Sequence, residues 1–312
     1  MINNCEESFS TPVSYLFYNR PQCIEITFPT IQRLRPKKLY LLADGPKNSD
    51  DDELCKQSRN LVDQFLDWEC QVTKIYSEKN LGLAHRTVSA IDQIFQEEED
   101  IIFLEDDNLV DDSFFYFCQD LLEKYKYNLN ISHIAGCNFY EKAVPRNYSY
   151  SYLFSSRPAA WGFATWKRAW KHMDLSMKNW ANEDKISFLQ PWCCSSKHAR
   201  GMKKIFDQHC MNDDPWAWSY AWIYACWANN SLSIIPAKNL VSNIGFGPDA
   251  TNTKYNQHNF EGFPNQRGNF QSLHHPEKIS RCMNFDKTYY QMEKGSFLRR
   301  LKNKLKSFLF WK

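Results

Sequence analysis

The sequence predicts an α/β protein in which a mixed, mostly parallel sheet is flanked by helices. Short apolar runs alternate with amphipathic segments of helical length through the first third of its 312 residues. The fourth run, residues 100–104, is almost entirely apolar, as expected for a strand covered on both faces. Polar residues follow several of these runs directly. A chain of this length can bury a large core without cross-links.

The expected elements follow one another in a regular order with short connections. The expected strands cover residues 12–18, 38–43, 71–76 and 100–104, and the expected helices cover residues 22–34, 51–67 and 83–96. Turn-forming sequences separate them, among them Asn19-Arg20-Pro21, Asp44-Gly45-Pro46 and Asn80-Leu81-Gly82. Because strands alternate with helices, the sheet should be parallel over this half of the chain.

Composition excludes several functional classes. Lys plus Arg (38) nearly balances Asp plus Glu (36), so no overall basic charge indicates a nucleic-acid partner. Eleven cysteines without C-x-x-C spacing, and an N-terminus without the features of a secretory signal, predict a cytoplasmic protein with reduced thiols. Cys193, Cys194, His198, His209 and Cys210 match no common zinc spacing and are interpreted as structural.

The acidic run Glu105-Asp106-Asp107 directly follows the fourth strand. Ligands of such sheets gather at the carboxyl ends of the strands. In a continuing strand, Glu105 and Asp107 would face the ligand and Asp106 would point elsewhere. A hard cation held here could bridge the oxygens of a nucleotide diphosphate. The alternative is a solvated acidic turn. A glycosidase pair fits less well, because its carboxylates flank the bond at roughly 5 to 9.5 Å from each other.

The order of these motifs resembles the GT-A nucleotide-sugar transferases and is most similar to bacterial relatives of N-acetylglucosaminyltransferase I. The resemblance covers residues 12–276 and includes Ser113-Phe114-Phe115 after the acidic run. It implies that Asp107 binds Mn²⁺ (or Mg²⁺), that Glu105 contacts the donor sugar and that Asp106 lies near the ribose. It also implies that Arg20 and Asp44 hold the uridine end. Alternatively, Arg20 caps a helix or forms a salt bridge, and Asp44 belongs to a simple turn.

The predicted donor-binding residues extend beyond these motifs. Trp161-Gly162 could place backbone and an aromatic wall beside a sugar, whereas Trp166 and Trp170 are expected in the core. The full donor-binding set is Asn19, Arg20, Asp44, Asn80, Glu105, Asp106, Trp161 and Gly162.

The catalytic base is sought in the aromatic stretch of residues 212–222. In N-acetylglucosaminyltransferase I the base is an Asp in a Trp-Asp-Asp-Trp run, which resembles this stretch. Bacterial relatives often show Trp-Asp-x-x-Trp, and Ser219 stands where that Asp would fall. Asp214, followed by Asp213, is the preferred base, with Asp214 also expected to cap the helix that leads to Trp227. Alternatively, both aspartates are caps and the base lies elsewhere.

Three C-terminal features complete the prediction. Residues 239–251 resemble a strand followed by a Gly-rich loop, either a lid over the donor or a mere turn. His274-His275-Pro276 could contact metal or phosphate. Residues 296–312 carry six Lys or Arg and no acid, with leucines at helical spacing, so they could lie on an anionic membrane. Nucleic acid, a partner helix or docking on the core are the alternatives for this tail.

The sequence therefore predicts three parts: a nucleotide-sugar-binding half (1–150), an acceptor-binding and catalytic half (151–276) and a basic tail (277–312). Together they indicate a metal-dependent, inverting glycosyltransferase with a UDP-linked donor and a glycan or lipid-linked acceptor. It would act in cell-envelope polysaccharide synthesis at the inner face of the plasma membrane. A metal-dependent nucleotidyltransferase and a catalytically silent sugar-binding scaffold are the alternatives.

Overall fold

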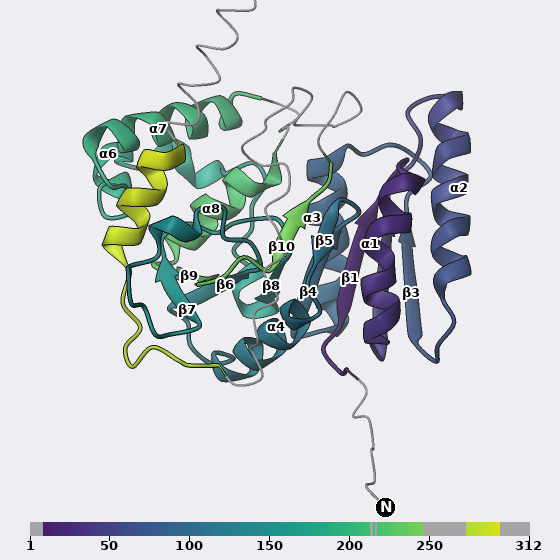
Figure 1. Cartoon of the computed structure of the whole chain (residues 1–312). Helices are drawn as coiled ribbons and strands as arrows, with labels where there is room; N and C mark the ends of the chain where they lie inside the picture. Colours follow the sequence, from purple (N-terminus) through teal and green to yellow (C-terminus); the bar gives the residue numbers. More distant parts are fainter. Residues whose placement is uncertain (1–8, 213–214, 216, 246–272, 294–312) are drawn as a thin grey trace, which may run out of the picture.

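The chain folds around one mixed eight-stranded sheet (Figure 1). The computed structural model describes residues 9–212, 215, 217–245 and 273–293. The strand order is β3-β2-β1-β4-β8-β6-β9-β7, and a separate two-stranded ribbon pairs β10 with β5. Four of the seven neighbouring pairs in the large sheet are parallel. The predicted α/β class, with a mostly parallel mixed sheet flanked by helices, is confirmed.

The first half of the chain follows the predicted order closely. Its elements are β1 (Val13–Phe17), α1 (Pro21–Leu34), β2 (Lys38–Ala43), α2 (Ser49–Phe65), β3 (Gln71–Tyr76), α3 (Leu83–Glu97) and β4 (Asp100–Glu105). Strand β1 pairs in parallel with both β2 and β4, and β2 pairs in parallel with β3. The carboxyl ends of β1, β2 and β4 therefore meet at one edge of the sheet.

The second half adds four strands to the large sheet, with both parallel and antiparallel pairing, and the two strands of the separate ribbon. Its strands are β5 (Asn108–Val110), β6 (Ile131–Ala135), β7 (Tyr152–Ser155), β8 (Phe163–Trp166), β9 (Leu232–Pro236) and β10 (Val241–Asn243). Its helices are α4 (Ser113–Lys124), η1 (Glu141–Ala143), α5 (Lys167–Trp170), η2 (Lys178–Asn182), α6 (Lys185–Leu189), α7 (Ser196–Cys210) and α8 (Trp218–Ala228), and residues 283–293 are also helical. Strands on both sides of residue 150 thus belong to one sheet.

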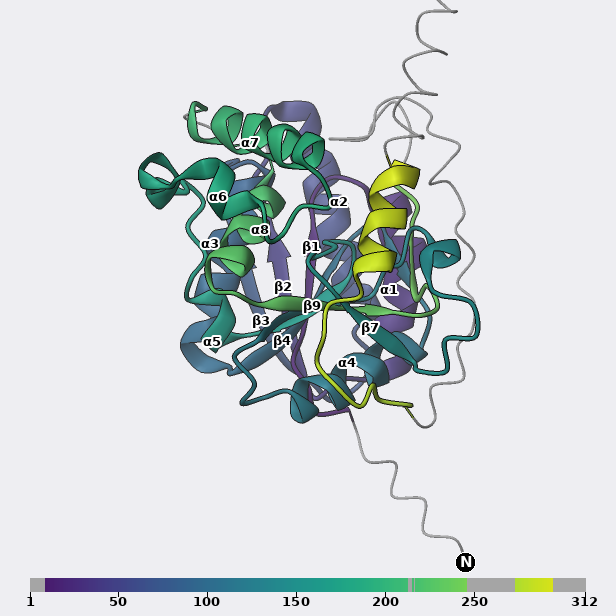
Figure 2. The same ribbon diagram turned by 90° about the vertical axis from the view of Figure 1, so that its left-hand side faces the viewer.

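Helices cover both faces of this sheet (Figure 2). On one face, α1 and α4 pack with the helix of residues 283–293 in a core that includes Phe28, Phe117 and Tyr289. On the other, α3, α7 and α8 enclose a second core that includes Ile91 and Trp222. The four apolar residues 101–104 of β4 are buried between these two cores, which explains the continuous apolar sequence.

The aromatic stretch differs from the prediction at one point. Helix α8 begins at Trp218 with Ala217 at its N-cap, so Asp214 does not cap it. Ala217 has extended backbone angles (φ −143°, ψ 106°), which keeps the chain before Trp218 out of the helix. Trp166 and Trp170 are buried, as expected for core residues, although Trp166 ends β8 and precedes the short α5.

Several predictions fall on residues outside the described ranges: Asp213 and Asp214, the loop after residue 245, and the tail of residues 296–312. Among the helices of the described ranges, none has the length and apolarity required to cross a membrane.

Candidate active site

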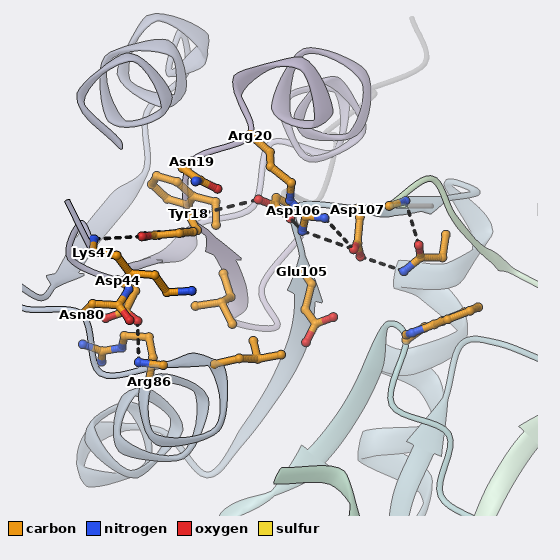
Figure 3. Close-up of a pocket in the computed structure, with 17 residues that line it drawn as sticks. Tyr18, Asn19, Arg20, Asp44, Lys47, Asn80, Arg86, Glu105, Asp106 and Asp107 are labelled. Carbon is orange, nitrogen blue, oxygen red and sulfur yellow. Dashed lines mark hydrogen bonds and ion pairs between the residues drawn. The ribbon is translucent and has the colours of Figure 1, made fainter. Parts of the chain in front are cut away.

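A cavity lies where β1, β2 and β4 end and α3 begins (Figure 3). Eight predicted site residues line it: Asn19, Arg20, Asp44, Asn80, Glu105, Asp106, Asp107 and Trp161. Asn19 and Trp161, which are 142 positions apart in the sequence, therefore line the same cavity. The polar residues that follow the strands gather because parallel strands end at the same edge. Nine further residues line the cavity without having been named as site residues: Leu16, Phe17, Tyr18, Lys47, Gly82, Leu83, Arg86, Asn243 and Gly245. Asn243 and Gly245 belong to the segment 239–251, for which a lid over the donor or a turn was expected.

The acidic run turns away from the sheet immediately after β4. Strand β4 ends at Glu105, and Asp106 and Asp107 form the turn that leads into β5. The alternation expected for a continuing strand therefore stops, and the prediction that Asp106 points elsewhere is wrong. Asp106 is buried, lines the same cavity, and accepts a hydrogen bond from the Tyr18 backbone N–H at 3.3 Å.

Arg20 joins the two aspartates. Its guanidinium forms an ion pair with Asp106 and lies 3.2 Å from Asp107 Oδ2. Arg20 also stands at the N-cap of α1, where its carbonyl oxygen accepts hydrogen bonds from the first turn. Burial lowers the pKa of Arg20, but the charges of Asp106 and Asp107 outweigh burial and hold that pKa above its ordinary value. Both structural alternatives considered for Arg20, the cap position and the salt bridge, are present in a residue that lines the cavity.

Glu105 is held in a half-buried position at the end of β4. The side chain of Trp218, the first residue of α8, lies near its carboxylate and lowers the pKa of Glu105. Burial raises the pKa of Glu105, as do the charges of Asp107 and Asp106, while Arg20 lowers it. Burial likewise raises the pKa of Asp106, against the opposing effect of Arg20. Three acids with one arginine thus concentrate negative charge, which favours an additional cation.

Asp107 is the member of the run best placed to hold a metal ion. Its Oδ1 accepts hydrogen bonds from the amides of Asn108 and Asn243, each at 2.8 Å. Its Oδ2 faces Arg20 at the longer distance of 3.2 Å. Within the described ranges no three His, Cys, Asp or Glu side chains form a group that could hold a metal. The donor set does not fit an all-protein cage, but it fits a cation held by one carboxylate and completed by phosphate and water oxygens.

The β2 side of the cavity is built around Asp44. Its buried carboxylate accepts hydrogen bonds from the backbone N–H groups of Gly45 (3.0 Å), Leu81 (2.9 Å) and Gly82 (2.9 Å). The Asn80 side-chain amide donates to the Gly45 carbonyl oxygen at 2.7 Å. These bonds join the loop after β2 to the loop before α3. Asp44 and Asn80 therefore shape the cavity wall through bonds to the backbone.

Asp51 orders the rim of the cavity beside β1. The Tyr18 hydroxyl donates to Asp51 at 2.9 Å, and the Asn19 amide donates to Asp51 at 2.6 Å. The Lys47 backbone N–H donates to the Tyr18 hydroxyl at 3.2 Å, and the Lys47 ammonium lies 5.8 Å from the centroid of the Tyr18 ring. An aromatic face and a cation are thus fixed together on this rim.

Arg86 is the most unusual lining residue. Only 3% of its surface is exposed, and its Nε and Nη2 have no hydrogen-bond partner among the described residues. Burial lowers the pKa of Arg86, against the raising effect of the nearby Asp44. Buried donors without partners are costly, and a ligand oxygen could satisfy them. The sequence held a signal for this residue: Arg86 lies three positions after Leu83, on the same face of α3, and Leu83 also lines the cavity.

Gly162 is predicted to bring backbone close to a ligand. It has φ of +57°, its N–H donates to Asn108 at 2.8 Å, and a Cβ at this position would lie 2.8 Å from a methyl group of Val241. The glycine is required by its positive φ and by packing against β10. Gly162 is not among the described residues that line the cavity, whereas its neighbour Trp161 is, so the predicted approach of the Gly162 backbone to a ligand stays a prediction.

The histidine pair lies elsewhere in the fold. His275 Nδ1 is hydrogen-bonded to the Tyr152 hydroxyl on β7 at 3.0 Å, and His274 N–H donates to Ser151 at 2.9 Å. Strand β7 is the edge strand opposite β3, so among the described residues this pair is not part of the cavity.

Comparison with known proteins adds limited information. No protein-family model matches the chain, and no curated protein matches it. Among solved structures, a mannosyltransferase of Pyrobaculum calidifontis in complex with GDP-Man and Mn²⁺ is similar at 14% identity and a TM-score of 0.36, covering 53% of this chain and 47% of that one. Residues 1–349 of S. aureus TarS give 12% identity and a TM-score of 0.36, covering 53% and 50% of the two chains. The chain spans about half the length of these two structures.

A UDP-glucose pyrophosphorylase from Acinetobacter baumanii is similar at 9% identity and a TM-score of 0.39, with coverage of 72% of this chain and 85% of that one. TM-scores below 0.5 are too low to assign a function. The assignment therefore depends on the site itself.

Proposed function

We propose that the protein is a metal-dependent glycosyltransferase that moves a sugar from a UDP-linked donor to a glycan or lipid-linked acceptor. One observation carries the proposal: the cavity has two chemically different ends (Figure 3). Glu105, Asp106 and Asp107 lie at one end, and Lys47 and Arg86 lie at the other. A nucleotide-sugar diphosphate with its cation needs acids for the cation and donors for its anionic and carbonyl oxygens.

The nucleotide is proposed to bind on the β2 side. Arg86 offers buried N–H groups without partners among the described residues, Lys47 offers a cation on the rim, and Tyr18 offers an aromatic face. Asp44 and Asn80 keep the wall in shape, and a direct contact between Asp44 and the uridine remains part of the proposal. Predicted contacts of Asn19 and Trp161 with the donor remain part of it as well.

The diphosphate and the sugar are proposed to lie on the β4 side. Asp107 would hold Mn²⁺ or Mg²⁺, which when bound would neutralise negative charge on the departing diphosphate. Arg20 holds Asp106 and Asp107 together, so the acidic turn keeps its shape. Glu105, beside Trp218, can accept a hydrogen bond from a sugar hydroxyl when it is ionised.

The acceptor is proposed to approach from the chain segment that precedes α8. Trp218 lies near Glu105, and Asp213 and Asp214 precede Trp218 by a few positions in the sequence. Asp214, or Asp213, would take the proton of the acceptor hydroxyl as its oxygen attacks the anomeric carbon. A new carbon–oxygen bond forms there, the bond to the diphosphate breaks, and the configuration inverts. Ser219 lies in the first turn of α8 and supplies no carboxylate.

The basic tail completes the proposal. Residues 296–312 would hold the enzyme on an anionic membrane surface, where envelope glycans are built on lipid carriers. Liposome flotation of the full chain and of a chain without residues 296–312 tests this point. Equal flotation of both proteins would exclude a membrane role for the tail.

The main test is binding and turnover with defined nucleotides. Thermal shift with UDP and Mn²⁺ should raise the unfolding temperature more than UDP with a chelator, and a panel of UDP-sugars should yield UDP in the presence of an acceptor. Absence of both effects would exclude the proposed function. Release of pyrophosphate from a nucleoside triphosphate would indicate a nucleotidyltransferase. Donor binding without turnover, across a wide acceptor panel, would indicate a silent scaffold.

A further inference from the structure

The short strand β10 brings a distant part of the chain to the acidic turn. It pairs antiparallel with β5 in a register that sets Asn243 opposite Asn108. The Ile244 N–H also donates to the Asp107 carbonyl oxygen at 2.9 Å, beyond the end of the ribbon. The backbone of residues 241–245 is thereby fixed against the turn that carries Asp107.

Asn243 uses this position to contact the Asp107 carboxylate. Its amide donates to Oδ1 at 2.8 Å, while its own Oδ1 accepts the Gly245 N–H at 2.8 Å. Asn108 donates to the same carboxylate oxygen at 2.8 Å. Two amide donors on Oδ1 set the plane of the carboxylate, while Oδ2 accepts two longer hydrogen bonds from Arg20 Nη1 and Nη2, both at 3.2 Å. Oδ2 is therefore the oxygen that a cation would take, in exchange for these longer contacts.

Gly245 lies against the other side of the same carboxylate. A Cβ at this position would be 2.2 Å from Asp107 Oδ2 and 2.8 Å from Asp107 Cβ and Cγ. No side chain fits there unless Asp107 moves. The space beside Oδ2 therefore depends on a residue without a side chain.

We infer that Asn243 and Gly245 are positioning residues that hold the Asp107 carboxylate ready for a divalent cation and so set the affinity of the protein for that cation. The inference deepens the proposed function and rests on its assignment of Asp107. Groups that orient metal ligands typically change metal affinity about 10- to 100-fold when they are removed. They act through Asp107 and need no contact with the cation.

The test is a Mn²⁺ titration in the presence of saturating UDP, with free Mn²⁺ followed by electron paramagnetic resonance. Asn243→Ala and Gly245→Ala should each weaken Mn²⁺ binding about 10- to 100-fold, with the full binding capacity recovered at high Mn²⁺. If Asn243→Ala does not fold, Asn243→Ser, whose hydroxyl is too short to reach Asp107, takes its place. A variant that regains the full Mn²⁺-binding capacity at high Mn²⁺ is folded and has lost only the positioning of Asp107. A variant with a damaged fold would not regain that capacity.

Two matched controls lie in helices away from the cavity. Gly201→Ala adds a Cβ in α7 at a position with no atom within 4 Å, and Asn229→Ala removes an amide that donates to the Ala225 carbonyl oxygen at the end of α8. Both should bind Mn²⁺ like the wild type. Wild-type Mn²⁺ affinity in both cavity variants would overturn the inference while the proposed function stands. Absence of Mn²⁺ binding by wild type with UDP would overturn both.

Discussion

Replacing Arg20 by methionine probes the charge balance of the acidic turn directly. Arg20 is the cation that faces both Asp106 and Asp107, and the exposed fractions of the three side chains are 19%, 2% and 14%. Methionine keeps much of the side-chain volume and removes the charge. Two partly or fully buried carboxylates then lose their partner.

The structure allows an estimate of the size of this effect. Removing one partner of a buried ion pair costs about 3 to 5 kcal/mol, because the remaining charge stays buried. Since Arg20 and Asp107 retain some contact with water, a value at the lower end, about 3 kcal/mol, is expected for Arg20→Met. In a protein of 312 residues that loss lowers the unfolding temperature by about 5 °C.

The loss should depend on pH in a defined direction. Without Arg20, the pKa of Asp106 rises further above its value in the unfolded chain, so the folded variant keeps a proton that the unfolded chain releases. Stability of the variant relative to wild type therefore improves as pH falls through the raised pKa of Asp106. Urea unfolding at a series of pH values measures this difference.

Arg33→Met is the matched control, because Arg33 in the same helix α1 pairs with Asp112 on the surface at 3.0 Å. Both side chains of that pair are more than half exposed, so its removal should cost less than about 1 kcal/mol. An Arg20→Met protein as stable as the Arg33→Met protein, with no pH-dependent difference, would refute the reasoning.

Three further predictions follow from the site and the core. Arg86→Met should weaken UDP binding about 10- to 100-fold in calorimetry. The variant should keep its stability, because Arg86 is buried and two of its N–H donors lack partners among the described residues. Unchanged UDP affinity would contradict the role of Arg86 in nucleotide binding. Burial and the neighbouring acids raise the pKa of Glu105 to about 8, so Mn²⁺ binding should release protons and become stronger as the pH rises toward that value. Calorimetry in buffers of different ionisation enthalpy measures the number of protons released. Mn²⁺ binding that does not depend on pH would contradict this prediction. His133 should remain neutral at about pH 5 in ¹⁵N NMR, because burial lowers its pKa to about 4 and the Trp222 indole donates to its Nδ1 at 3.1 Å. Titration of His133 near the ordinary value of about 6.5 would contradict that prediction.

Local sequence was sufficient to predict the β4 side of the site. The apolar run before Glu105 is typical of a buried strand in an α/β sheet, and parallel strands bring their carboxyl ends together. Asn19 and Asp44 follow the strands β1 and β2, and Asn80 lies just before helix α3. All three therefore lie at the same edge of the sheet as the acidic run. Their detailed bonds were not predictable: Asp44 and Asn80 bind backbone groups of neighbouring loops, which depends on loop conformation.

The remaining differences come from distant pairing and from the exact ends of a strand and a helix. Asn243 lies 136 positions after Asp107, and only the pairing of β10 with β5 brings them together. Asp106 was misplaced because the strand ends at Glu105, two residues before Asp107, to which the expected alternation extended. Trp218 begins α8 without a capping side chain, so no local signal marked that helix start.

The central claim is that Asp107 holds the cation through which a nucleotide diphosphate binds. Calorimetric titration of UDP into wild type and into Asp107→Asn, each with Mn²⁺ and with a chelator, tests it most directly, with Asp112→Asn on the surface beside α4 as control. The structure predicts Mn²⁺-dependent UDP binding by wild type and the control, and loss of the Mn²⁺ dependence in Asp107→Asn. Equal UDP affinity with and without Mn²⁺ in wild type, or an unchanged Mn²⁺ dependence in Asp107→Asn, would contradict the claim.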